Sequence, residues 1–173
     1  MTLETALRPP GAAERRDAQA LLNRALGDRA YTEADLTAPG VHVLAVFAGA
    51  TMIGVGVAQE GVDGAMFSRS FGISVDDRSG CIAALAVDPR ECGRGVAKAL
   101  LAALVQRLRG CPQIIAVRRK RERDGLDRAA GFRVAAASKD FYPRVSREFG
   151  WRCPECREAC ACEAVLVVLP GAE

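Results

Sequence analysis

The chain has 173 residues, half of them hydrophobic, so it can form a sizeable core, and we expect one domain over residues 1–173. Its formal net charge of +3 is too small to favour nucleic acid or a membrane surface as a partner. No apolar run approaches the roughly 20 residues that span a bilayer, and the N-terminus carries acids and prolines instead of an apolar signal core. These features indicate a cytoplasmic protein, where seven cysteines are more typical of reduced thiols or a metal site than of disulfides.

Five elements are predicted in the first third of the chain. They are a strand at 3–8, a helix at 12–26, a short helix at 31–36, and hairpin strands at 41–47 and 51–58. The first helix follows from apolar residues that share one helical face and from the glycine that ends it. The hairpin follows from two apolar runs joined by three small residues.

The stretch 59–79 is polar and rich in glycine, and its residues 66–72 could form a helical turn or a loop. Six elements follow it. They are a buried strand at 81–87, a helix at 94–109, a strand at 113–117, a charged stretch at 118–124 leading into a short helix that ends at Gly131, and strands at 132–138 and 164–169. The mixture of apolar strands with an amphipathic helix at 94–109 predicts an α/β (α+β) fold.

A turn with Gly-Arg-Gly at its tip joins the strand at 81–87 to the helix at 94–109. The first N–H groups of a helix have no backbone partner and carry a partial positive charge, and glycines let a ligand approach the backbone closely. Such a turn suits an anion. A Walker loop needs a Lys and a Ser or Thr that are missing here, and the three-glycine dinucleotide pattern is missing too. A diphosphate held by backbone amides and Arg94 is one interpretation, and a turn without a ligand is the other.

The wider stretch "ALAVDPRECGRGVAKALLAAL" resembles the coenzyme A signature of the GNAT N-acetyltransferase superfamily. Val87, Asp88 and Pro89 match its strand end, and the glycine turn follows with the residues Cys92, Gly93, Arg94, Gly95, Val96 and Ala97. Cys92 stands where Arg or Gln is usual. Further along, "LDRAAGF" at 126–132 is similar to a second family pattern, with Asp127 where many members carry a tyrosine.

The resemblance implies a GNAT fold, with a mixed central sheet of about six to seven strands splayed at the coenzyme site and about four flanking helices. It implies an acetyl-CoA-dependent N-acetyltransferase, in which a small-molecule or peptide amine attacks the thioester directly. The pyrophosphate would bind the amides of residues 93–97, and the pantetheine arm would pair with the backbone at Val87. The amide near Leu85 would polarise the thioester carbonyl. We expect a monomer or homodimer and neither a nucleic acid nor a membrane partner.

The resemblance leaves the acid and base of the reaction open. Cys81 occupies the position where several members carry an acid, and as a small buried residue it suits packing better than proton transfer. Asp127 is expected on a helix surface. Tyr142 could reach the cleft and protonate the leaving thiolate. Four further residues could bind the acceptor or serve the structure: Tyr31, His42, Glu60 and Asp63.

Four of the seven cysteines lie within ten residues, in "WRCPECREACAC": Cys153, Cys156, Cys160 and Cys162. Four thiolates match a closed tetrahedral zinc site with a structural role, placed between the last two strands. An iron–sulfur cluster and free redox thiols remain alternatives.

Two functions from other classes stay open beside the acetyltransferase. One is a coenzyme A-binding regulator without turnover, because Cys92 and Asp127 depart from the family pattern. The other is a zinc-knuckle nucleic-acid binder that uses the bases at 118–123, although acids are mixed with these bases and a solvated face explains them better.

Overall fold

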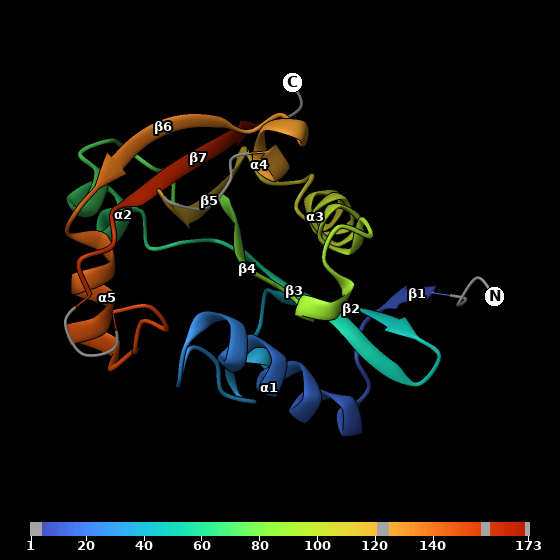
Figure 1. The fold of residues 1–173 in the computed structure, drawn as a ribbon. Coiled ribbons are helices and arrows are strands. Elements are labelled where there is room, and N and C mark those ends of the chain that lie inside the picture. Colours follow the sequence, from blue (N-terminus) through green and yellow to red (C-terminus); the bar gives the residue numbers. More distant parts are fainter. Residues whose placement is uncertain (1–4, 121–124, 157–159, 172–173) are drawn as a thin grey trace.

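The computed structural model describes residues 5–120, 125–156 and 160–171 (Figure 1). Its strands form one seven-stranded sheet in the order β1-β2-β3-β4-β5-β7-β6. The strands are β1 (Thr5–Arg8), β2 (Val41–Ala48), β3 (Thr51–Glu60), β4 (Gly80–Val87), β5 (Gln113–Arg119), β6 (Arg133–Ser138) and β7 (Ala164–Pro170). Only the β4–β5 pair is parallel, and the other neighbouring strands are antiparallel. The mixed sheet confirms the expected fold class.

Five α-helices and three 3₁₀ turns lie among the described residues. The helices are α1 (Arg15–Leu26), α2 (Gly64–Phe71), α3 (Val96–Arg107), α4 (Gly125–Ala129) and α5 (Phe141–Phe149). The turns are η1 (Ala12–Glu14), η2 (Asp35–Thr37) and η3 (Pro89–Glu91). None of the helices in these ranges has the length and apolar character needed to cross a membrane.

The sheet opens between β4 and β5. These strands pair only from Gly80 to Ile82 against Ile114 to Ala116. Beyond Ile82, β4 continues to pair with β3 alone, and Ala83 is an extra residue between the pairs formed by Ile82 and Ala84. A β-bulge of this kind bends and twists its strand, so the two halves of the sheet diverge from that point. The expected splay of the central sheet is therefore present.

Two helices cover opposite faces of the first half of the sheet (Figure 1). α3 packs against β2, β3 and β4 through three fully buried leucines, which are Leu100, Leu104 and, directly after the helix, Leu108. Leu21 and Leu22 of α1 pack on the other face with Val55, Val57 and Ala84. A third apolar cluster joins α2 and α5 to β5 and β7 through stacked phenylalanines.

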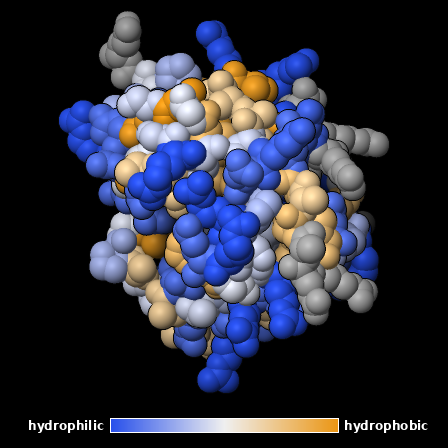
Figure 2. Space-filling view, turned by 90° about the vertical axis from the view of Figure 1, so that its left-hand side faces the viewer, coloured by the Kyte–Doolittle hydropathy of each residue, from blue (hydrophilic) through white to orange (hydrophobic). Residues whose placement is uncertain are grey.

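Figure 2 shows the side of the molecule where α2 and α5 lie, and its apolar residues form small areas within a mostly hydrophilic surface.

Several predicted elements differ from the structure. The residues 31–36 do not form an α-helix: the Asp35 carboxylate accepts from the Thr32 amide and hydroxyl, and only the 3₁₀ turn η2 follows. The helix predicted at 94–109 begins at Val96, since Gly95 has φ +82° and is its left-handed N-cap. Residues 66–71 belong to a full helix, α2, and α5 had no counterpart in the predicted elements.

The charged stretch after the strand at 113–117 also divides differently. Arg118 and Arg119 continue β5 instead of opening a helix, and Arg119 is only 8% exposed. Residues 121–124 of this stretch lie outside the described residues. The strand was underestimated because two arginines in sequence resemble a solvated segment, whereas here both side chains have acidic partners.

Candidate functional site

The turn between β4 and α3 presents a group of backbone amides without partners. Gly93 and Gly95 have φ values of +81° and +82°, a conformation that favours glycine, and a Cβ at either position would meet nothing within 4 Å. Within the described residues, no group accepts a hydrogen bond from the amides of Gly93, Gly95, Val96, Ala97 or Lys98. The open N-terminus of a twelve-residue helix and these amides together favour a bound anion.

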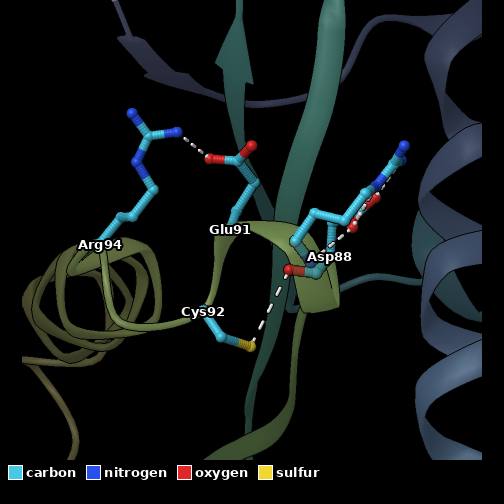
Figure 3. Close-up of polar contacts among 5 residues, drawn as sticks. Asp88, Glu91, Cys92 and Arg94 are labelled. Carbon is cyan, nitrogen blue, oxygen red and sulfur yellow. Dashed lines mark hydrogen bonds and ion pairs between the residues drawn. The ribbon is translucent and has the colours of Figure 1, made fainter.

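Charged side chains hold the base of this turn (Figure 3). The Asp88 carboxylate accepts from the Arg90 amide at 3.0 Å and from its guanidinium at 2.8 Å, and these bonds hold the pKa of that carboxyl well below its usual range. Arg94 donates to Glu91 at 2.6 Å, with 60% of its side chain exposed. The guanidinium is thus at the surface of the turn, and its bond to Glu91 uses only Nη1. Cys92 is exposed, and its sulfur lies 3.9 Å from the Asp88 carbonyl.

The edge of β4 that faces the opening carries unpaired backbone groups beside this turn. The Asp88 amide donates to the Ile53 carbonyl at 2.9 Å. Since alternate residues of an antiparallel strand bond to the same neighbour, Ala86 and Ala84 also face β3. Leu85 and Val87 therefore direct their N–H and C=O groups toward the opening. This geometry offers an extended ligand a strand edge that leads into the amides of residues 93–98.

A sequence model of the acetyltransferase (GNAT) family matches residues 11–128, which include α1, the opening of the sheet and the glycine turn. The chain belongs to the GNAT acetyltransferase family. A search of curated proteins finds no match.

Solved structures share the fold of this GNAT acetyltransferase over nearly the whole chain. The ribosomal-protein-S18-alanine N-acetyltransferase from Escherichia coli is 17% identical, with a TM-score of 0.68, and the alignment covers 98% of this chain and 96% of that one. A Bacillus subtilis acetyltransferase in complex with CoA is 19% identical, with a TM-score of 0.66 and coverage of 99% and 100%. The Salmonella typhimurium putative acetyltransferase yncA, with its cofactor acetyl-CoA, is 15% identical, with a TM-score of 0.67 and coverage of 98% and 95%.

The structure gives three of the candidate acids and bases other roles. Burial raises the pKa of the Cys81 thiol to about 12, so it stays protonated, in agreement with a packing role. The Asp63 carboxylate caps α2 by accepting from the Met66 amide at 2.8 Å. His42 Nε2 lies 2.8 Å from Glu60 Oε1, which ties β2 to β3.

The sequence predicts Asp127 on a helix surface, but the structure does not place it there. Its carboxylate accepts from Arg118 Nε at 2.8 Å, and both side chains are only 16% exposed. The other carboxylate oxygen, Oδ1, is buried without a hydrogen-bond partner. The prediction was wrong because Leu126 of α4 and Phe132, which follows this helix, pack against the core on the α3 side. This packing turns Asp127 inward.

The two tyrosines of the chain lie in different surroundings. Tyr31 follows α1, with its amide donating to Asn23 Oδ1 at 2.8 Å, and burial raises the pKa of its hydroxyl. Tyr142 lies on α5, with its ring 5.3 Å from that of Phe141 and 5.5 Å from that of Trp151. Trp151 and Tyr142 border the cysteine cluster, so Tyr142 connects this cluster to the core between α5 and the sheet.

The four clustered cysteines converge on one point. The sulfurs of Cys153, Cys156, Cys160 and Cys162 all lie within 4.8 Å of one another. Two of these separations are 3.8 Å (153 to 162) and 3.5 Å (156 to 162), too long for a disulfide bond of about 2.05 Å. A tetrahedral zinc with Zn–S bonds of about 2.3 Å places its sulfurs about 3.8 Å apart. The observed spacing therefore fits a tetrathiolate metal site.

The surroundings of the sulfurs act on the thiolate form in opposite directions. The Ala161 amide donates to the sulfur of Cys156 and lowers its pKa, whereas burial raises the pKa of the Cys160 and Cys162 thiols. Cys153 and Cys160 are buried, with 1% and 9% exposure. Four thiolates this close would repel one another strongly unless a metal ion compensated their charge.

Residues that the sequence did not single out also shape the site. Arg119 donates to Glu155 at 2.9 Å and joins β5 to the cysteine segment. The Trp151 indole donates to the Leu26 carbonyl at 2.9 Å and joins the same segment to α1. The single tryptophan and the acid between two cysteines were visible in the sequence, but their partners lie 125 and 36 residues away.

Proposed function

We propose that this protein transfers the acetyl group of acetyl-CoA to a primary amine. The observation that carries the proposal is the continuity of two features. The strand edge at Leu85 and Val87 suits a pantetheine arm, and it leads directly to the unpartnered amides of Gly93 and residues 95–98, which suit a pyrophosphate. The CoA-bound and acetyl-CoA-bound structures of similar fold support the same ligand.

The chemistry would use backbone groups more than side chains. When bound, acetyl-CoA supplies an activated acetyl thioester. The Leu85 N–H would donate to the carbonyl oxygen as negative charge develops there, which is an oxyanion-hole contribution. The acceptor must arrive as a neutral amine, because its lone pair forms the new C–N bond while the C–S bond breaks. Val87 and the amides of Gly93 to Ala97 would bind and orient, with Cys92 and Arg94 at the rim of the turn.

Tyr142 is our candidate for protonating the leaving thiolate. It is one of two tyrosines in the chain, and its ring lies between Phe141 and Trp151 on the side of β5 and β7. Where no side chain reaches the sulfur, water would supply the proton instead.

We also propose that the four cysteines bind one structural zinc ion. They provide four sulfur donors at tetrahedral spacing, and a closed site of this kind has no position for water or substrate. Residues Cys153, Cys156, Cys160 and Cys162 would each supply one thiolate. Purified protein prepared without chelator should contain about one zinc per chain by elemental analysis. Metal-free protein with four titratable thiols in this segment would refute the assignment.

The test of the proposed function combines binding with turnover. Calorimetric titration with CoA should show one site per chain, and a panel of amines, amino acids, polyamines, aminoglycosides and peptides should release CoA from acetyl-CoA. Binding without release by any class would favour a coenzyme A-binding regulator. Absence of binding would refute the assignment of the glycine turn.

A further inference from the structure

The cysteine segment connects the end of α1, a helix that packs on β3 and β4, with β5 in the other half of the sheet. We call the described residues 151–156 and 160–162 the knuckle. On the side of α1, the Trp151 indole donates to Leu26 and the Arg152 amide donates to the Asp28 carbonyl at 3.5 Å. A Cβ at Gly27 would overlap the Arg152 carbonyl, so the end of α1 and the knuckle approach each other as closely as a glycine allows. Ala30 completes the contact by packing beside Trp151 and Cys153.

The other side of the knuckle is attached to β5. Glu155, between two of the cysteines, accepts from the buried Arg119 at the end of this strand. Glu163 follows the last cysteine, and its carbonyl accepts from the Lys120 amide at 2.8 Å while its carboxylate accepts from the Lys120 ammonium at 3.0 Å. Figure 1 shows the segment after α5 reaching toward the end of α1, beneath the opening of the sheet.

The knuckle contacts the end of α1 and the residues that follow it, and this segment leads into the opening. Residue 30 is followed by Tyr31, whose amide and carbonyl are both held by Asn23. Tyr31 packs in the apolar cluster that contains Ala84 and Ala86 of β4. These β4 residues follow the bulge at Ala83, where the opening begins. The position of residues 26–31 therefore sets one wall of the opening on the α1 face.

We infer that the metal-loaded knuckle is a brace across this opening, which fixes the wall against which the acceptor amine must dock. This inference rests on the proposed function for what the opening binds. Its physical basis is that β4 and β5 share only the three residue pairs from Gly80 to Ile82. Because the two halves share so few pairs, a second connection between them would limit changes in their separation. The knuckle supplies that connection, and the ion holds the knuckle itself together.

The coenzyme side should be independent of the brace. The glycine turn begins α3, which packs on the other face of the sheet, in an apolar cluster separate from that of the knuckle. Metal removal should therefore loosen residues 26–31 and leave CoA affinity nearly unchanged.

Hydrogen exchange of the full chain, zinc-loaded and after treatment with a strong chelator, tests the brace. The amides of Gly27, Ala30 and Tyr31 should exchange at least about tenfold faster without metal, whereas those of Val55 and Leu104 in the core should not change. Trp151, the only tryptophan, should report the same event by fluorescence, because it packs on two of the cysteines. Unchanged exchange at residues 26–31, or faster exchange throughout the chain, would overturn the inference.

Three variants separate the brace from the metal site. Cys156→Ser should lose zinc and show faster exchange at residues 26–31. Trp151→Phe removes the indole N–H but keeps a ring, so zinc should remain while exchange at Gly27 and Ala30 still rises. Cys111→Ser, a thiol outside the cluster, should change neither. Retained protection in Trp151→Phe and Cys156→Ser would overturn the brace.

CoA titration of the same samples distinguishes this inference from the proposed function. Affinity within about twofold across all variants, together with the exchange changes, supports both. If the wild-type chain did not bind CoA, the proposed function would be refuted. The exchange result could still confirm the connection between the knuckle and α1.

Discussion

Ile82 and Ala116 form the last residue pair that joins β4 to β5, and the next residue of β4, Ala83, is exposed although it lies in the middle of the sheet. The bulge at Ala83 ends the pairing and turns the following residues so that Leu85 and Val87 face an opening. The opening, more than any single side chain, makes the site, because the groups that would contact the thioester and its pantetheine arm are backbone amides and carbonyls.

Gly95→Asp should abolish CoA binding while the fold remains. A Cβ at this position meets no atom within 4 Å, but its carboxylate would occupy the space in front of the amides of residues 93–98 and repel a pyrophosphate. Gly95→Asn is the matched control, since asparagine has the same size, no charge and some tolerance for positive φ. Calorimetry with CoA should rank wild type above Asn and Asn well above Asp. Equal affinities for the two variants would show that charge at this turn does not matter to the ligand.

Tyr142→Phe should lower turnover by about 10²-fold with CoA affinity unchanged, if the hydroxyl protonates the leaving thiolate. Phenylalanine preserves the ring contacts to Phe141 and Trp151, so zinc content should also stay the same. Steady-state rates across pH, with zinc measured on the same sample, provide the comparison. A fully active variant would remove Tyr142 from the reaction and leave water as the donor.

Gly54→Ala should reduce the free energy of unfolding by about 1–3 kcal/mol, because a Cβ there would lie 2.6 Å from Val96 Cγ1 and 3.2 Å from Leu100 Cδ1. The first turn of α3 would have to move away from β3, and the glycine turn with it. Gly110→Ala is the control, since a Cβ there meets nothing within 4 Å. Urea unfolding curves of the two variants should differ in midpoint and share one slope. Equal midpoints would show that α3 can shift at no cost.

The stability of the N-terminal region should depend on Glu14 under acidic conditions. The carboxylate accepts from Arg8 at 2.6 and 2.7 Å and from the Gly11 amide at 2.6 Å, which lowers its pKa from the usual 4.5 to about 2. Because the folded pKa is depressed, the stabilisation is present above pH 4.5 and is lost as pH falls through 2.

Thermal unfolding from pH 6 to about pH 2 measures this contribution. Glu14→Gln should lower the melting temperature near pH 6, and the difference from wild type should vanish toward pH 2. The effect should be small and should shrink in high salt, since the pair is exposed. A difference that stayed constant with pH would exclude ionisation of Glu14 as its cause.

Local patterns in the sequence determined much of this protein. The apolar runs at 81–87 and 164–169, the spacing of leucines after Gly95 and the turn at 87–97 each depend on neighbours within one strand or helix. Glycines at 93 and 95 were needed because the backbone itself must adopt positive φ there. The cysteine spacing likewise indicated one tetrathiolate site, since four thiols within ten residues are close enough in the chain to converge on one cation.

Tertiary structure alone decided the rest, because the contacts involved join residues far apart in the chain. The pairing of β4 with β5 ends at Ile82 through a bulge that no composition rule predicts. Arg119 and Asp127 resembled solvated residues until strand and helix packing buried them beside acid and base partners. The connection from Trp151 to Leu26 spans 125 residues, so only the folded chain shows that the cysteine knuckle lies at the edge of the opening.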